Sequence, residues 1–126
     1  MKRVAAACAI FVLLILGCAG AYLSVDRVTQ SLAAEVQLAH DALASENYDE
    51  ASRIMQNGYR NWRSQHELLG ALIRHNEIDE IENLYLRAIQ CTKNEDSDEG
   101  QMQTLELSGM LRHLTEMERP SAGNIL

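Results

Sequence analysis

The stretch VAAACAIFVLLILGCAGAYL, from Val4 to Leu23, is uncharged and almost entirely apolar, and it determines where the protein is located. Its twenty residues rise about 30 Å as an α-helix, which matches the hydrocarbon core of a bilayer. Lys2 and Arg3 directly precede it, and cations beside a membrane helix favour the cytoplasmic side. The sequence therefore predicts a single-pass protein of the cell membrane, with a cytoplasmic N-terminus and an extracytoplasmic body.

Three fates are open to this segment, residues 1–23. The length of the apolar stretch favours retention as an uncleaved signal-anchor. Cleavage near Ala21 is the second fate, because Ala19-Gly20-Ala21 has the small-x-small form of a secretory cleavage site. In the third, Cys18 is lipidated, although Leu16 is bulkier than the residue usually found two positions before an acylated cysteine. All three fates place the body at or beyond the outer face of the membrane.

The remainder divides into a helical domain over residues 24–120 and a short tail over residues 121–126. The whole chain carries a formal charge of −7, and the part that follows Lys2 and Arg3 carries −9. Such a body is repelled by nucleic acid and by anionic lipid, so no nucleic-acid partner is expected. Cys91 is the only cysteine of the body, which predicts a free buried thiol, with an intermolecular disulfide as the alternative.

The body is predicted to be helical throughout, because glycine is sparse and no alternating strand pattern occurs. Apolar residues recur every three or four positions in four segments, at about residues 24–45, 48–74, 77–92 and 98–118. Asn47 and Asn76 are candidate N-caps, Glu50 completes a capping box with Asn47, and Pro120 ends the last helix. The first of these helices is expected to continue straight out of the membrane helix.

The predicted fold class is therefore all-α, with an N-terminal transmembrane helix followed by four amphipathic helices. Short connections between such helices make them antiparallel neighbours. Two arrangements bury all four apolar stripes, namely an antiparallel bundle and a pair of tetratricopeptide-like (TPR-like) hairpins. The stretch from Leu43 to Ala51, with Tyr48, resembles the turn of a TPR-like hairpin, although stable repeat arrays need about three units.

No segment carries a recognisable reaction chemistry. Asn94, Asp96 and Asp98 begin like a calcium-binding EF-hand loop, but Glu99 replaces the required glycine and Leu105 the bidentate glutamate. Zinc, nucleotide and serine-hydrolase motifs do not occur in the sequence. We therefore expect neither a metal nor another cofactor, and no enzymatic activity.

Five side chains are predicted to serve packing or interaction. Tyr59, Trp62 and His66 lie on the apolar stripe of the second helix, so His66 is expected in the core or an interface. Tyr48 begins that helix, and His75 lies at the turn that follows it. These residue types at helical spacing favour a helix-packing role over a ligand site.

The segments Tyr48-Asp49-Glu50-Ala51, His75-Asn76-Glu77-Ile78-Asp79-Glu80-Ile81 and Asn124-Ile125-Leu126, together with Trp62 and Leu68-Leu69, give the chain a family resemblance. The chain resembles a family of short bacterial proteins that is catalogued only as a domain of unknown function. The resemblance covers essentially the whole chain and implies a small protein of Gram-positive bacteria with one membrane helix and an all-helical body. It implies no activity.

The leading functional hypothesis is a membrane-tethered, envelope-facing interaction or structural protein that binds a protein partner or a second copy of itself. One alternative is a helical bundle that senses a small ligand or a metal through Tyr59, Trp62, His66 and Tyr85. Another is a lipoprotein anchored through Cys18. An envelope enzyme would require His40, His75 and His113 to gather with acids around one pocket.

Overall fold

The computed structural model describes residues 1–117, with side chains described up to Leu114. It contains five helices in this range, and no strand occurs there. They are α1 (Lys2–Ala44), α2 (Tyr48–Ser64), α3 (His66–Leu72), α4 (His75–Lys93) and α5 (Ser97–Met117). The predicted all-α fold is confirmed, whereas the predicted helix stop at Pro120 and the tail over residues 121–126 lie outside the described residues.

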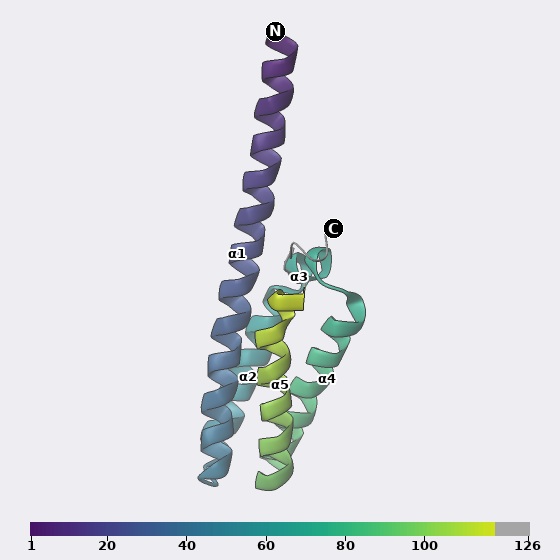
Figure 1. Ribbon diagram of the computed structural model, residues 1–126. Coiled ribbons are helices and arrows are strands. Elements are labelled where there is room, and N and C mark those ends of the chain that lie inside the picture. Colours follow the sequence, from purple (N-terminus) through teal and green to yellow (C-terminus); the bar gives the residue numbers. More distant parts are fainter. Residues whose placement is uncertain (118–126) are drawn as a thin grey trace.

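Helix α1 is a single unbroken helix of 43 residues, and its two halves have different surroundings. Residues 1–20 are exposed, whereas the second half buries one residue at every third or fourth position, from Val25 to Leu43. Figure 1 shows this helix rising far beyond the other four. Among the described helices, α1 alone is long and apolar enough to cross a membrane. The predicted continuation of the apolar helix into the body is therefore confirmed.

The lower half of α1 forms an antiparallel four-helix bundle with α2, α4 and α5 (Figure 1). Helix α1 packs against α2 and α5, and α4 packs against the same two helices, so α1 and α4 lie diagonally across the bundle. Of the two arrangements that the sequence left open, the described residues adopt the bundle. We call the end where α1 leaves the bundle, beside α3, the proximal end, and the opposite end the distal end.

The two helical hairpins of the bundle repeat each other 49 residues apart. Nine pairs of equivalent positions are buried in both hairpins: Thr29, Leu32, Val36, Ala39 and Leu43 of α1 correspond to Ile78, Ile81, Tyr85, Ala88 and Thr92 of α4, and Ala51, Met55, Gly58 and Trp62 of α2 correspond to Gly100, Thr104, Leu107 and Leu111 of α5. Each hairpin thus presents the same stripe to the core, although the side chains on the stripe differ in size.

The two distal turns are also equivalent. Glu46 and Glu95 adopt the left-handed conformation with φ of 57° and 54°. The next residues, Asn47 and Asp96, donate their backbone N–H groups to carbonyl groups five residues earlier, over 2.8 Å and 3.0 Å. These bonds are the Schellman motif, which satisfies free carbonyl groups at a helix C-terminus. Both turns therefore stop a helix without a glycine.

Each distal turn also caps the helix that it begins. Asn47 Oδ1 accepts the backbone N–H of Glu50 at 3.4 Å, and Asp96 Oδ1 accepts that of Glu99 at 3.2 Å. A side-chain oxygen at this position stabilises a helix by about 1 kcal/mol. The predicted N-cap at Asn47 is confirmed.

The second predicted helix is shorter than expected, because it ends at Ser64 rather than Arg74. Ser64 Oγ donates a hydrogen bond of 2.7 Å to the carbonyl of Asn61, and the Gln65 N–H bonds the Trp62 carbonyl at 3.1 Å. Serine side chains that bond the preceding turn compete with the helical pattern and bend helices. The chain turns here and forms α3 at the proximal end.

The predicted N-cap at Asn76 is wrong. Ile73 and Arg74 are extended, with ψ of 150° and 139°, and α4 already begins at His75. Asn76 lies within the first turn of α4, where its side chain is exposed. The helix starts two residues before the predicted Glu77, because the extended pair carries the chain from α3 directly into it.

Candidate functional site

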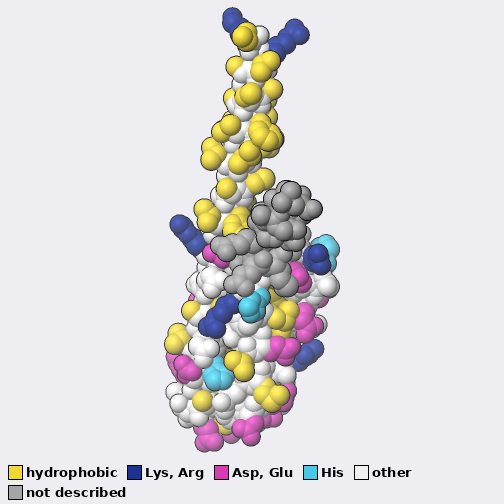
Figure 2. Space-filling model, viewed as in Figure 1, with side chains coloured by type: hydrophobic (Ala, Val, Ile, Leu, Met, Phe, Trp, Pro, Cys, Tyr) yellow, Lys and Arg dark blue, Asp and Glu magenta, His cyan; other side chains and the backbone are white. Residues whose placement is uncertain are grey.

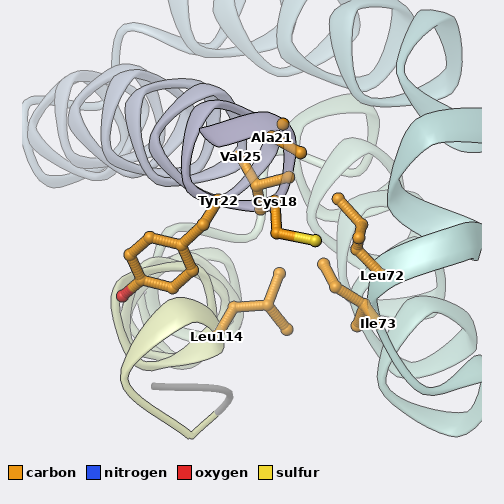
Figure 3. A pocket seen from close by; sticks show the side chains of 8 residues that line it. Cys18, Ala21, Tyr22, Val25, Leu72, Ile73 and Leu114 are labelled. Carbon is orange, nitrogen blue, oxygen red and sulfur yellow. The ribbon is translucent and has the colours of Figure 1, made fainter. Parts of the chain in front are cut away.

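The proximal end of the bundle contains an apolar groove (Figure 3). Its cavity volume is about 310 Å³, and its lining residues are Gly17, Cys18, Ala21, Tyr22 and Val25 of α1, Leu72 at the end of α3, Ile73 after it, and Leu114 of α5. Figure 3 shows the Cys18 side chain pointing toward Leu72 and Ile73. We call this cavity the proximal groove.

The proximal groove exists because the helices differ in length. α1 continues past the bundle, so the face of α1 from Gly17 to Val25 is only partly covered by the ends of the shorter helices. Four of the lining residues, from Gly17 to Tyr22, belong to the apolar stretch that predicts a membrane helix. The bundle thus overlaps the end of that stretch.

Two exposed leucines of α3 extend this apolar region. Leu68 and Leu72 are 39% and 42% exposed, and they share one face of α3 because they are four residues apart. Leu69, on the other face, is fully buried in the core. Leu68, Leu72 and the proximal groove together form what we call the proximal apolar surface.

A second, polar groove runs along the side of the bundle between α1 and α2. Two adjoining cavities of about 360 and 280 Å³ share Glu35 and Asn61. The remaining lining residues are Leu38, Arg53, Ile54, Asn57 and Arg60 toward the distal end and Arg27, Val28, Ser31, Leu32, Ser64 and Gln65 toward the proximal end. We call this pair of cavities the lateral groove. It combines three guanidinium groups with one exposed leucine.

The distal end is strongly acidic. Its two turns and the helix starts that follow hold Glu46, Asp49, Glu50, Glu95, Asp96, Asp98 and Glu99. Figure 2 shows acidic side chains, and no basic ones, at the tip of the face in view. Tyr48 lies half-buried among them, and its pKa is raised first by partial burial and then by the nearby carboxylates, beginning with Glu46. Within the described residues, no group of three or more His, Cys, Asp or Glu side chains is placed to hold a metal ion.

The predicted packing residues Tyr59 and Trp62 lie in an aromatic cluster between α2 and α4. Trp62 and Tyr85 are fully buried with ring centroids 6.4 Å apart, and Tyr59 lies 6.0 Å from Tyr85. The Tyr59 hydroxyl donates to Glu82 Oε1 at 3.1 Å, and Arg63 Nη1 donates to the same oxygen at 2.8 Å. The Glu82 hydrogen bond raises the pKa of Arg63. The cluster therefore joins the two hairpins.

Two polar atoms in this cluster have no hydrogen-bond partner, namely Trp62 Nε1 and the Tyr85 hydroxyl. Burial raises the pKa of Tyr85, and the charge of Glu35 raises it further. The cavities of the proximal and lateral grooves are lined by other residues, so neither opens onto these two atoms. The cluster is a packed core and does not form a ligand pocket with either groove.

The histidines are not brought together. His66 is exposed at the start of α3, so the expected position in the core is wrong, because the helix breaks just before it. The alternative position in an interface stays a prediction. His75 is exposed at the start of α4, at the proximal end. His40 lies toward the distal end of α1, with Nδ1 3.5 Å from Asp41 Oδ1, and His113 is exposed on α5. His66 therefore does not join Tyr59, Trp62 and Tyr85 in a ligand-sensing site. The three histidines that an enzyme would need around one pocket lie at opposite ends of the bundle.

The sequence did not point to the residues that complete the two grooves. Leu72, Ile73 and Leu114 come from two helix ends that no local pattern brings together, and Glu35 occupies the flank of an ordinary amphipathic helix. One signal was present for α3, because Leu68-Leu69 and Leu72-Ile73 place apolar residues on both sides of a short helix. Such doublets indicate a helix with two covered faces.

The comparisons with known proteins give a family and no function. A family model described as "Domain of unknown function (DUF4363)" matches residues 20–125. No curated protein and no solved structure matches the chain. The matched range includes every helix of the bundle and begins within the apolar stretch. The chain therefore belongs to the family described as Domain of unknown function (DUF4363).

Proposed function

We propose that this protein is a membrane-tethered helical interaction module that faces the cell envelope and binds a protein partner. The observation that carries the proposal is the unbroken course of α1. One helix supplies both an exposed apolar stretch of membrane-spanning length and one quarter of the bundle core. A bundle joined to its anchor in this way has no flexible linker, so it presents its sides at a fixed height above the membrane.

We further propose that the lateral groove receives the partner. Protein interfaces are enriched in arginine and combine an apolar centre with a polar rim. The lateral groove has this composition, because Leu38 is 59% exposed and shares one cavity with Arg53 and Arg60, while Arg27 lines the adjoining cavity. Glu35 and the amide side chains add hydrogen-bonding groups that would fix the register of a bound helix or strand.

A photo-crosslinking amino acid at position 38 tests this role in membranes of the producing cell. A matched control places the same amino acid at position 86, because Leu86 is 47% exposed on α4, away from the groove. The expected result is a discrete crosslinked species at position 38 that is absent at position 86. Monomer alone at both positions would count against an interaction module.

The orientation has its own test. Reporter fusions at the C-terminus, active only on one side of the membrane, are expected to report an extracytoplasmic body. Activity of a cytoplasmic reporter would reverse the proposed topology.

A second form of tether is a lipoprotein anchored through Cys18. Cys18 is exposed and lines the proximal groove, and the helix before it is exposed along its length. Removal of residues 1–17 would therefore leave the core residues of the bundle in place. The intact mass of the mature protein separates the two forms, because a signal-anchor retains the full chain, whereas lipidation removes residues 1–17 and adds acyl groups to Cys18.

A further inference from the structure

We propose that the proximal end of the bundle is seated in the headgroup region of the bilayer that α1 crosses, with the proximal apolar surface as its contact. The occupant of this surface is therefore lipid. The inference rests on the proposed function, because it takes α1 as the membrane helix, and it adds a second contact with the same membrane.

The length of the apolar part of α1 determines how close the bundle must lie to the membrane. If the bilayer began only beyond the proximal groove, the helix available to cross it would run from Val4 to about Gly17. Fourteen residues span only about 21 Å, whereas the hydrocarbon core is about 30 Å thick. The stretch reaches the required length only when the level of Cys18 to Leu23 lies within the membrane.

The proximal groove shows which part of the bundle lies at the level of Cys18 to Leu23. Leu72 and Ile73 share the proximal groove with Cys18, which lies five residues, or about 8 Å of helix, before Leu23. Headgroups occupy about 5–8 Å on each side of the core. With Leu23 at the edge of the hydrocarbon, Leu72 and Ile73 lie in its outermost layer, and the part of the proximal end level with Leu23 and beyond lies in the headgroup region.

The side chains at this level fit that position. Leu68 and Leu72 are exposed and apolar, so burial in lipid removes their surfaces from water. Tyr22 is half-buried on α1 at the same level, and tyrosine is enriched where membranes meet water. Arg74 follows α3 and is exposed, and a long cationic side chain there reaches phosphate groups. Glu67 is also exposed on α3, where a hydrated carboxylate is tolerated only on the outer side of the headgroups.

The charge distribution agrees with an end-on position. The body as a whole is acidic, which opposes contact with anionic lipid. The acids of the two distal turns, from Glu46 to Glu50 and from Glu95 to Glu99, lie at the end farthest from α3 (Figures 1 and 2). Seating the proximal end on the membrane holds these groups one bundle length away from the lipid surface, beyond the screening length of about 8 Å.

Tryptophan fluorescence of the full-length protein in phosphatidylcholine vesicles tests the inference, with lipids that carry bromine atoms near the headgroup end of the acyl chains. The test variant is Leu68→Trp, which replaces a leucine that is 39% exposed, and the matched control is Leu86→Trp, which replaces a leucine on the side of α4 that is 47% exposed. Trp62 is buried and contributes the same background to both. The expected result is quenching by the brominated lipid and a blue-shifted emission for Leu68→Trp, with no change for Leu86→Trp.

A further variant distinguishes two hypotheses, namely that the proximal apolar surface contacts lipid and that α1 crosses the membrane. Phe11→Trp reports on the membrane helix itself, because Phe11 is exposed in the middle of the apolar stretch. Quenching of Phe11→Trp without quenching of Leu68→Trp would contradict the lipid contact of the proximal apolar surface but not the membrane insertion of α1. An unquenched Phe11→Trp would contradict both.

Two other occupants give distinct results, and each would overturn the proposal. If the tail covers the surface, Leu68→Trp is quenched only in a chain that ends at residue 117. If a second copy of the chain covers the surface, the emission of Leu68→Trp is blue-shifted without quenching. It then shifts back to the red when the ratio of protein to lipid in the vesicles is lowered.

Discussion

Gly100 faces the side chain of Leu43 so closely that a β-carbon at position 100 would lie 3.0 Å from Leu43 Cδ1 and 3.1 Å from Cδ2. Leu43 is fully buried, so it has little room to move. Beside this contact, Ser97 Oγ donates a hydrogen bond of 2.6 Å to the Leu43 carbonyl. The first turn of α5 is thus fastened to the last turn of α1, which closes the bundle at its distal end.

This contact predicts the effect of Gly100→Ala. Alanine favours helix by about 1 kcal/mol over glycine, but overpacking a core costs about 1–3 kcal/mol. We expect Gly100→Ala to lower the free energy of unfolding of the full-length protein in detergent, measured by urea titration with circular dichroism. The matched control is Gly109→Ala on the same helix, where a β-carbon meets nothing within 4 Å. Gly109→Ala should raise stability by about 0.5–1 kcal/mol, and equal gains for both variants would contradict the packing described above.

Tyr85→Phe is expected to stabilise the protein near neutral pH. The Tyr85 hydroxyl is buried without a hydrogen-bond partner, and its removal relieves a desolvation cost of about 1 kcal/mol. Tyr59→Phe is the control, because it deletes the hydrogen bond to Glu82 and should cost about 0.5–1.5 kcal/mol. The same urea titration measures both variants. A destabilised Tyr85→Phe would mean that the hydroxyl has a partner, such as an ordered water molecule.

Tyr85 also predicts a loss of stability in alkali. Because burial raises its pKa above the ordinary value of 10.0, the folded chain keeps the phenolic proton while the unfolded chain releases it. The stability that depends on this proton is complete below pH 10.0 and falls as the pH rises from there toward the raised pKa. Unfolding free energies measured below and above pH 10.0 should therefore drop less in Tyr85→Phe than in the wild type. Parallel pH profiles for the two proteins would refute this assignment.

Cys91 is predicted to react slowly with thiol reagents. Its side chain is 9% exposed, and burial, followed by the charges of Asp96 and Glu99, raises its pKa. The thiolate is the reactive form, so both effects slow alkylation near neutral pH. In a chain with Cys8 and Cys18 replaced by serine, mass spectrometry should find slower iodoacetamide labelling of the folded protein than of the same protein in urea. Equal rates would place the thiol at the surface.

The helices of this protein follow from local patterns in the sequence. The apolar stretch and the stripe that continues from Val25 predict the two halves of α1, and the spacing of Asn47 and Glu50 predicts the start of α2. Each of these signals lies within a few turns of helix. The aromatic residue Trp62 also lies in the core, as its place on the stripe indicates.

The break before α3 did not follow from such patterns. The stripe of the second helix runs through Trp62, His66, Leu69 and Ile73 without a glycine or proline that would interrupt it at Ser64 and Gln65. The chain turns there because Ser64 and Gln65 bond back to the last carbonyl groups of α2, and Leu69 of the short helix that follows still packs in the core. His66 was misplaced for the same reason, since it begins a new helix and lies in solvent.

The two grooves could not be predicted, because each depends on relationships between distant segments. The proximal groove forms because α1 extends beyond the ends of α3 and α5. Its lining includes both Cys18 and Leu114, which are almost a hundred residues apart in the sequence. The lateral groove depends on how α1 and α2 cross, with Glu35 between them. Relative helix lengths and crossing geometry are set by packing over the whole bundle.

The 49-residue correspondence has a consequence for the origin of the bundle. A pair of identical hairpins related by a two-fold axis would form the same four-helix core, so the chain has the form of a dimer made continuous by duplication and fusion. In such an ancestor the contacts between α2 and α4 and between α5 and α1 would have been identical. In the present chain the two contacts differ in a complementary way: Gly58 lies against Tyr85, whereas the equivalent positions hold Leu107 and Val36. Because a large residue faces a small one in only one of the two contacts, each hairpin fits the other better than it would fit a copy of itself.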